Sequence, residues 1–490
     1  MTDPTEELIY FNGVDGNRGG YAMPPMSIRT LVALARGARI DPVTVERLRY
    51  INAKRDSETY GWPDDIDLKN VREAGWAVLI HENEDLEVRK VLERLYEHRR
   101  AQIMDDSIVK LLTVGAGETD YVAWLNRHQV HAGSPEPSLV PCYLLIAGSP
   151  SQIPFSFSQG LSTEYIPGRI HFDNAAEYAA YIDSLIAYEN SAIPQTGKEV
   201  VYFAPCRDND NATKASVNRL VRPLAGLTPE PDGAPPLPLS RTTVALRRGF
   251  RQRELLVDQA TKTNLCEIFS PPNGQKAPSL LFTASHGMIR NRHDLQQRAD
   301  QGALICQEWQ GGVPLPAHYF AAADLPVTAR LHGLIAFLFA CYSGGTPTID
   351  RFFQQGFVPR ELTDTPFLSA LPKALMARPG GGALACIAHI DRAWASSFNK
   401  RRIVTQIKPF EKAIERLLRG FPVGFALRDF SDRYARLSVD ISNTLFRIEN
   451  QEIPSDTFID LMWDWIERND AEGYVLIGDP AAHLRVDDLV

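Results

Sequence analysis

The chain of 490 residues is long enough for two or three domains, and its 44% hydrophobic content is ordinary for a protein with a sizeable core. Its 52 Lys and Arg against 60 Asp and Glu leave a net charge of −8, so nothing at whole-chain level favours binding to nucleic acid or to an anionic membrane. A basic cluster at residues 247–253 lies among acidic and neutral residues, which favours a solvated face.

The N-terminus and the cysteines bear on the compartment of the protein. The first residues form neither the basic nor the apolar region of a signal peptide, and no apolar run reaches the ~18 residues of a membrane span. We therefore expect a cytoplasmic protein with no membrane partner. The six cysteines are widely spread without a Cys-x-x-Cys pair, which argues against a zinc site or a disulfide framework, so no metal is expected.

The first half of the chain alternates between apolar runs and helical patterns. Residues 10–21 are rich in glycine but lack the ending of a phosphate loop, so a turn-rich segment is favoured over nucleotide binding. Short helices are expected after Ser27 and Pro42. Strands are predicted at residues 76–80 and 141–147, and helices at 85–100 and 175–188. This alternation predicts a parallel α/β sheet.

The second half repeats the pattern. A strand at residues 200–203 precedes a polar loop at 207–211 and a helix from about Thr213, whereas the proline-rich residues 228–240 predict an exposed loop or tether. A hairpin-like excursion is expected at 290–299. Further predictions are a long connection at 346–365, a buried strand within 382–394, helices at 409–418 and 456–467, and a closing strand at 474–481.

Two buried strands of this half end in reactive side chains. Residues 279–284 lead into Ser285-His286-Gly287, and residues 334–340 lead into Cys341 and further small residues. Because the carboxyl ends of parallel strands line one edge of a sheet, neighbouring strands would bring His286 and Cys341 together. A free thiol has a pKa of ~8.5, so Cys341 needs an imidazole to act as a nucleophile at neutral pH.

Backbone groups beside these side chains suit the same chemistry. The N–H groups of Gly287 and Cys341 are candidates for holding the oxyanion of a tetrahedral intermediate. The pair His293-Asp294 is one candidate for orienting His286. His389, inside an apolar strand, is expected to be a core residue.

The pattern of an apolar strand ending in Ser285-His286-Gly287, then an apolar strand ending in residues 340–345, Ala-Cys-Tyr-Ser-Gly-Gly, resembles the caspase-like cysteine peptidases, the group of caspases, gingipains and CHAT proteases. The order of His before Cys is also the caspase order. Residues 143–155 and 167–181 look like the non-catalytic subdomain of gingipain-like bacterial members.

The resemblance implies a fold of two α/β subdomains, the second with a caspase-like, mostly parallel sheet flanked by helices. It divides the chain into an N-terminal extension of unknown role (1–70), a non-catalytic subdomain (71–192) and a catalytic domain (193–490). It also implies that the substrate pocket is built from residues 207–211 and 389–394. Asp208, Asp210 and Asp391 there would favour a basic residue before the cut, and Arg207 or Arg392 an acidic one. Trp394 is a candidate pocket wall.

The function expected from the resemblance is a cysteine endopeptidase that cleaves a protein or peptide substrate through a Cys341–His286 dyad and a thioester, without a cofactor. Some relatives are activated by calcium, and bacterial members often act in defence or cell death. Because a cytosolic peptidase with an unselective, always-open site would damage its host, regulation by an activating partner or an upstream protease is expected. The alternative is a catalytically silent scaffold or binding protein of the same fold. A serine hydrolase would need a Gly-x-Ser-x-Gly elbow and a zinc protease a His-Glu-x-x-His motif, and the sequence has neither.

Overall fold

The structure is a computed structural model that describes residues 8–9, 26–35, 62–63, 66–190, 194–228, 242–272, 274–355, 358–400, 404–450 and 458–489. The chain divides into one unit of Met1–Tyr60 with Val439–Met462 and a second of Gly61–Ser438 with Trp463–Val490. In the first unit, β1 (Leu8–Ile9) pairs with β2 (Met26–Ser27), and α1 (Ile28–Ala35) is the helix predicted after Ser27. The glycine-rich stretch, the helix after Pro42 and the proline-rich residues 229–241 lie outside the described residues.

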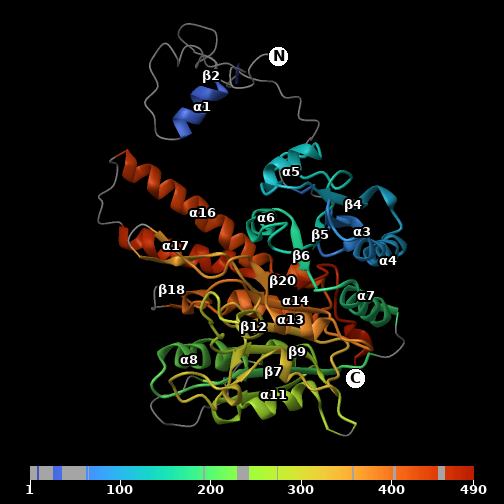
Figure 1. Cartoon of the computed structure of the whole chain (residues 1–490), viewed down its shortest axis with the longest axis vertical. Coiled ribbons are helices and arrows are strands. Elements are labelled where there is room, and N and C mark those ends of the chain that lie inside the picture. The colour runs from blue at the N-terminus through green and yellow to red at the C-terminus, as the bar shows by residue number, and fades with distance from the viewer. Residues whose placement is uncertain are drawn as a thin grey trace. The chain divides into compact units, whose positions relative to one another are not determined.

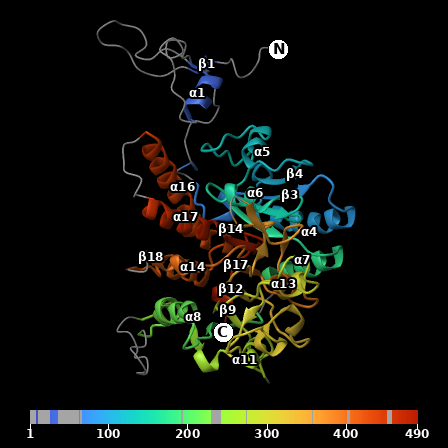
Figure 2. The ribbon, with the colours of Figure 1, turned by 60° about the vertical axis from the view of Figure 1, so that its left-hand side comes forward.

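The second unit is built on a ten-stranded sheet flanked by helices (Figures 1 and 2), which confirms the predicted mostly parallel α/β fold. The predicted strands of both halves of the chain lie in this one sheet. In spatial order the strands are β4 (Val109–Val114), β3 (Trp76–His81), β5 (Tyr143–Ala147), β6 (Ile166–Ile170), β20 (Tyr474–Gly478), β17 (Ala385–His389), β12 (Ile335–Phe339), β9 (Pro278–Ala284), β7 (Gly197–Ala204) and β8 (Arg251–Leu256).

One antiparallel pairing divides the sheet into two halves of opposite direction. All neighbouring strands run parallel except β20 and β17, which pair antiparallel from Ala385↔Gly478 to His389↔Tyr474. The last strand of the chain therefore lies between the two halves. As a result, the carboxyl ends of β4, β3, β5 and β6 lie at the edge of the sheet opposite to those of β17, β12, β9, β7 and β8.

Helices cover both faces because each strand buries alternate residues on opposite sides. In β3, Val78 and Ile80 pack with α4 (Leu86–Ile103) and α7 (Ala175–Asn190), whereas Leu79 packs with α5 (Tyr121–Arg127) and α6 (Phe155–Leu161). The predicted helix at 85–100 is α4, and the Asp85 carboxylate caps its first turn by accepting from the N–H groups of Glu87 and Val88.

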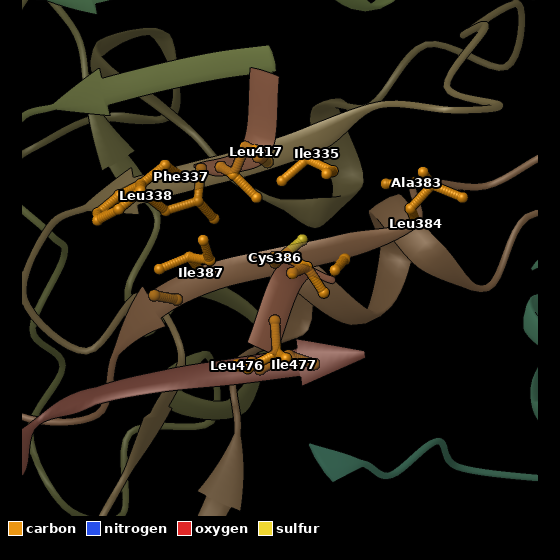
Figure 3. Close-up of a cluster of buried hydrophobic side chains, with 14 of the residues drawn as sticks. Ile335, Phe337, Leu338, Ala383, Leu384, Cys386, Ile387, Leu417, Leu476 and Ile477 are labelled. Atoms are coloured by element: carbon orange, nitrogen blue, oxygen red, sulfur yellow. The ribbon is translucent and has the colours of Figure 1, made fainter. Parts of the chain in front are cut away.

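The core of the second half of the sheet forms where three strands meet a helix. Ile335 and Phe337 of β12, Ile387 of β17 and Leu476 of β20 lie close to Leu417 of α14 (Lys408–Leu418), and all are at most 3% exposed (Figure 3). Burial of this many aliphatic and aromatic side chains on both faces fixes the register of β12.

Some elements differ from the prediction. Residues 290–299 form turns that lead into α12 (Gln297–Asp300), and the hairpin lies further along the chain, between β10 (Leu304–Ile305) and β11 (Tyr319–Phe320). The connection at 346–365 contains the antiparallel strands β14 (Ile349–Gln355) and β15 (Val358–Glu361). The 22-residue α16 (Arg428–Glu449) was not predicted, although its apolar residues recur at helical spacing (Phe430, Tyr434, Leu437, Ile441, Leu445 and Ile448).

The remaining elements are short, apart from α17. They are α3 (Val71–Ala74), α8 (Asn211–Ser216), α9 (Arg222–Leu224), α10 (Val244–Arg247), α11 (Lys262–Phe269), α13 (Ala370–Met376), α15 (Val423–Ala426), α17 (Phe458–Glu472), β13 (Gly345–Thr346), β16 (Phe367–Leu368), β18 (Asn399–Lys400) and β19 (Val404–Thr405). Among the helices described, none is both long and apolar enough to cross a membrane.

A buried ion-pair network ties the end of β20 to two helices. Asp479, which is fully buried, accepts hydrogen bonds from Arg99 Nε at 2.9 Å and from the indole N–H of Trp76 at 2.9 Å. The same Arg99 guanidinium donates to both oxygens of Glu189 on α7 at 2.8 Å. Burial disfavours the charged form of Glu189, but the Arg99 charge outweighs it and holds the pKa of this carboxyl below its usual range.

We predict that Arg99→Met lowers the free energy of unfolding by about 3–5 kcal/mol, because two buried carboxylates lose their shared cation. Urea denaturation at neutral pH measures this change. Arg100→Met is the control, because the pair between Arg100 and Asp106 is solvent-exposed and its loss is expected to change stability little. Equal effects of the two substitutions would contradict the role given to the buried network.

Candidate active site

Strand pairing brings the two predicted catalytic residues to the same edge of the sheet. β9 and β12 are parallel neighbours in which Ala284 is paired with Phe339. His286 and Cys341 each follow this pair by two residues. The contact continues past the strands, since the Ser285 N–H donates to the Phe339 carbonyl at 3.1 Å.

The backbone of Gly287 lies directly against that of Cys341. A Cβ atom added to Gly287 would lie 1.9 Å from the Cys341 carbonyl oxygen, so only glycine fits at this position. The N–H of Gly287 also faces the Cys341 thiol. In the part of the chain that the structure describes, neither the Gly287 nor the Cys341 N–H has an oxygen acceptor. Both predicted oxyanion donors are therefore available to a ligand.

A sharp turn follows Cys341. Tyr342 has a φ of 55°, a left-handed conformation that non-glycine residues seldom adopt. The turn is held from the end of β17, because the Tyr342 N–H donates to the Asp391 carbonyl at 2.9 Å and the Gly344 N–H to the His389 carbonyl at 2.9 Å. Cys341 remains partly exposed, and its Sγ lies 3.8 Å from the Ala393 carbonyl oxygen.

Asp210 is the partner of His286. Its Oδ2 lies 2.7 Å from His286 Nε2, and its other oxygen accepts from the first N–H groups of α8. Burial would raise the pKa of Asp210, but the His286 charge and the hydrogen bonds from Arg207 and His286 outweigh it and lower this pKa to about 2. A carboxylate can only accept, so His286 Nε2 carries the hydrogen and the lone pair of the neutral ring is on Nδ1.

Other side chains hold this Asp–His pair in place. Arg207 Nη2 donates to Asp210 Oδ2 at 2.8 Å, and the Arg207 guanidinium lies 3.8 Å from the ring centre of Trp309. The Trp309 ring meets the His286 imidazole edge to face at 6.1 Å. The predicted alternative, orientation by His293-Asp294, is wrong, because the His293 imidazole points to Asp364 at 3.3 Å and the side chain is 69% exposed.

The Cys341 thiol is protonated in the free protein at neutral pH. Desolvation raises the pKa of this thiol above its ordinary value, and the backbone groups of Ala393 and Gly287 and the positive charge of Arg392 offset the increase only in part. For this thiol to act as a nucleophile at neutral pH, a general base would have to take its proton.

The loop after β17 holds three of the residues predicted to bind substrate. Asp391 is fully buried, its Oδ2 lying 3.4 Å from Arg351 Nε. Arg392 Nη2 lies 2.5 Å from Oδ2 of the fully buried Asp350, and its side chain is 28% exposed. Trp394 packs on Phe352 at a ring distance of 5.0 Å, and its buried indole N–H has no acceptor among the described residues. Asp208 lies on the other loop and is exposed.

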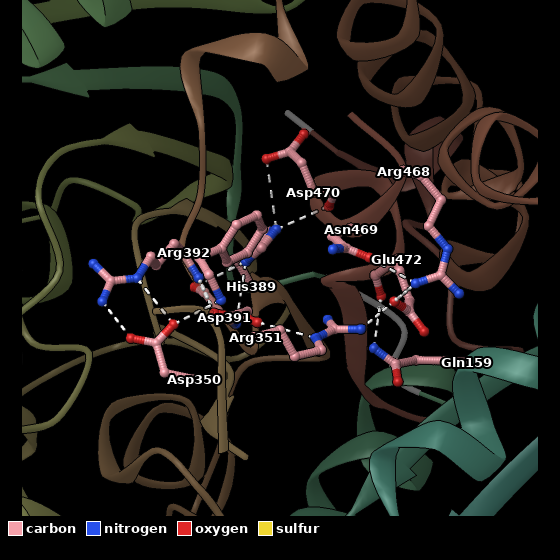
Figure 4. Close-up of polar contacts among 11 residues, drawn as sticks. Gln159, Asp350, Arg351, His389, Asp391, Arg392, Arg468, Asn469, Asp470 and Glu472 are labelled. Atoms are coloured by element: carbon pink, nitrogen blue, oxygen red, sulfur yellow. Dashed lines mark hydrogen bonds and ion pairs between the residues drawn. The ribbon is translucent and has the colours of Figure 1, made fainter. Parts of the chain in front are cut away.

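The sequence analysis missed three residues of this cluster. Asp350 and Arg351 come from β14, and Arg351 Nη1 also pairs with Glu472 of α17 (Figure 4). Figure 4 also shows Arg351 between Asp391 and Glu472, and Arg392 turned toward Asp350. His389 is fully buried, as expected, and lies in this network with Asp470. Only the Asp350-Arg351 dipeptide, close to Cys341 in sequence, could have indicated this arrangement.

The site contains groups for covalent acyl transfer. It places a partly exposed thiol, an imidazole oriented by a carboxylate and two backbone N–H groups that have no oxygen acceptor among the described residues at one edge of the sheet. Over the residues that the structure describes, no group of three or more His, Cys, Asp or Glu side chains could hold a metal ion.

Comparison with solved structures gives two matches. One is a complex of the pro- and mature domains of RgpB from Porphyromonas gingivalis, with a TM-score of 0.46 and 12% identity over 84% of this chain and 80% of that one. The other is described as a protease, with a TM-score of 0.46 and 11% identity over 85% and 79%. No family model and no curated protein matches the chain.

We predict that alkylation of Cys341 by iodoacetamide is slow at pH 7 and accelerates about tenfold for each pH unit while the pH stays below the pKa of the thiol. Mass spectrometry of the peptide that contains Cys341 measures the rate. Cys386 is the control: it is fully buried and is expected to stay unmodified at every pH. Fast alkylation of Cys341 that does not change from pH 6 upward would contradict the prediction, because it would require a thiolate in the free protein.

Proposed function

We propose that the protein is a cysteine peptidase in which Cys341 is the nucleophile and His286 the general base. The observation that carries the proposal is the junction of β9 and β12, where Gly287 contacts Cys341 and two backbone N–H groups remain without an oxygen acceptor. The resemblance of the strand-end motifs to caspase-like peptidases supports the same assignment. The alternative remains a catalytically silent scaffold.

In the proposed mechanism the Cys341 sulfur attacks the carbonyl carbon of a peptide bond while the thiol proton passes to His286 Nδ1. The N–H groups of Gly287 and Cys341 stabilise the oxyanion, and each such donor is typically worth about 3–4 kcal/mol. Collapse of the intermediate breaks the C–N bond, His286 returns the proton to the leaving amine, and a thioester remains. Water activated by His286 then hydrolyses the thioester and restores the thiol.

Asp210 serves this cycle as a positioning residue. By accepting from His286 Nε2–H it fixes the tautomer in which Nδ1 can take a proton, and its charge stabilises the imidazolium that forms. The mechanism needs no cofactor. A cytoplasmic location and control by an activating partner or an upstream protease are part of the proposal, as is a role in bacterial defence or cell death, which the resemblance implies.

Two partly exposed arginines lie in the cluster near Cys341, where they pair with the carboxylates of Asp350, Asp391 and Glu472. Arg392, next to Ala393, is 28% exposed and Arg351 is 32% exposed, whereas the carboxylates that hold them, Asp350 and Asp391, are fully buried. The buried carboxylates fix the guanidinium groups, whose exposed N–H donors match a carboxylate. We therefore propose that the enzyme prefers an acidic residue before the cut.

Peptidase activity is tested with a fluorogenic peptide library that varies the residue before the cut. We predict that the wild-type protein cleaves a subset of peptides and that Cys341→Ala and His286→Ala each lose essentially all cleavage, because nucleophile and base act as one unit. Asp210→Asn is expected to lower kcat tenfold or more while changing KM little, since it acts through His286.

Circular dichroism of each variant controls for folding. Activity that survives Cys341→Ala would contradict the proposal. A wild-type protein inert to the library, with Cys341 also unreactive toward electrophilic peptides, would favour the scaffold.

The charge preference of the pocket is tested with paired peptides. Peptides with Asp or Glu before the cut are expected to have a higher kcat/KM than the matched Arg or Lys peptides. Arg392→Gln is expected to lower kcat/KM for the acidic peptides by roughly 10- to 100-fold, because a charged hydrogen bond is worth about 1.5–3 kcal/mol. Arg392→Lys is expected to retain part of the preference for acidic peptides. Arg247→Gln, far along the chain, is the control and is expected to retain all of this preference. A preference for Arg or Lys peptides would overturn this assignment.

A further inference from the structure

A groove of about 640 Å³ lies away from the thiol, in the size range of small-molecule sites. Its walls come from the segment after β6, from α12, from β16 and from α13 with the residues that follow it. β6 ends at the edge of the sheet opposite to the one where β12 ends at Cys341. The groove is therefore separate from the candidate active site.

Three cationic side chains from different elements line this groove. Arg298 donates to the Thr365 hydroxyl at 2.5 Å, and Arg378 donates to the Val327 carbonyl at 2.6 Å; within the described chain neither arginine forms an ion pair. Lys373 pairs with Asp173 at 2.6 Å, in a contact where the Asp173 side chain is 67% exposed. The other acidic group, Glu177, accepts hydrogen bonds at the start of α7 from the Asn174 side chain and the Asp173 N–H.

A buried cation, Arg169, does not line this groove, but its charge acts on His171, which does. Arg169 is 3% exposed, and its two terminal nitrogens donate only to the carbonyls of Gly148 and Pro154, each at 3.1 Å. Its Nε has no partner in the described residues. A buried guanidinium without a counter-charge is costly. Two residues along, His171 lines the groove, and its pKa is lowered to about 4, first by burial and then by the charges of Lys373, Arg169 and Arg298.

We propose that this groove binds a small polyanion, a molecule with two or more phosphate or carboxylate groups, between Arg298 and Arg378. Such a ligand would bring negative charge to three cations of which only Lys373 has an acidic partner among the described residues. The groove is also connected to the segment after Cys341 through strand pairing. Phe367 and Leu368 line it as part of β16, which pairs with Gly345 and Thr346 soon after Cys341. Binding is therefore expected to change the rate at which Cys341 reacts.

The test is isothermal titration calorimetry on the full chain with inorganic pyrophosphate and, separately, with citrate, at ionic strength held constant by sodium chloride. We expect saturable binding at one site, weakened tenfold or more by Arg298→Gln and by Arg378→Gln, and unchanged in the exposed control Arg72→Gln. Tighter binding of pyrophosphate would assign a phosphate ligand, and tighter binding of citrate a carboxylate one.

A second measurement follows the protonation of His171 by NMR of 13C-labelled histidine, where bound anion is expected to raise the pKa of this imidazole. Both readouts are independent of peptidase activity. The proposal would be overturned if neither anion binds saturably to the wild-type protein, or if the two arginine variants bind as the wild type does.

Discussion

The parallel pairing of β9 with β12 is the interaction on which the candidate active site depends. It places His286 and Cys341 two residues beyond the same registered pair, although 55 positions separate them in the sequence. A slip by one residue would turn every side chain of β12 to the other face of the sheet, and the core around Phe337 and Ile335 opposes that slip. Apolar packing in the core, some distance away, therefore fixes the positions of the reactive side chains at the strand ends.

The reversal of direction at β20 determines what each edge of the sheet can carry. Because β20 runs antiparallel to β17 and parallel to β6, the two halves of the sheet place their carboxyl ends on opposite edges. The second half places Cys341, His286 and the loop after β17 on one edge, and the first half ends near the basic groove on the other. Asp479 holds this arrangement, since it follows β20 directly and is bound by Arg99 and Trp76.

The features predicted well from the sequence are those with a local cause. Continuous apolar runs identified β3, β5, β7, β9, β12, β17 and β20. The helical spacing of apolar residues identified α4, which begins directly after the capping residue Asp85. The strand-end residues Cys341, His286 and Gly287 stood out because each interrupts an apolar run. By contrast, β8 carries many polar residues because it is an edge strand, and α16 was missed although its apolar residues recur at helical spacing.

The partners of the site residues could not be predicted, because they depend on contacts between distant segments. Asp210 was expected in a substrate pocket as an isolated charge, yet the pairing of β7 with β9 puts the loop after β7 beside His286, 76 positions away in sequence. Likewise, the loop after β17 contains both acidic and basic residues, so its sequence did not predict whether the substrate pocket would be positively or negatively charged. Burial separates them, because Asp391 and Asp350 lie beneath Arg351 and Arg392 and only the arginines reach solvent.

In the proposed mechanism, the thiol and the imidazole become reactive together when substrate binds. Desolvation raises the pKa of the Cys341 thiol, and the Asp210 carboxylate accepts a hydrogen bond from His286 Nε2. A peptide carbonyl that accepts from the Gly287 and Cys341 N–H groups would take up the negative charge as it develops, so that proton transfer and attack become favourable together. In the proposed mechanism such coupling would keep the thiol unreactive toward chance electrophiles until a peptide occupies the oxyanion site, and the two arginines would add the proposed preference for an acidic residue.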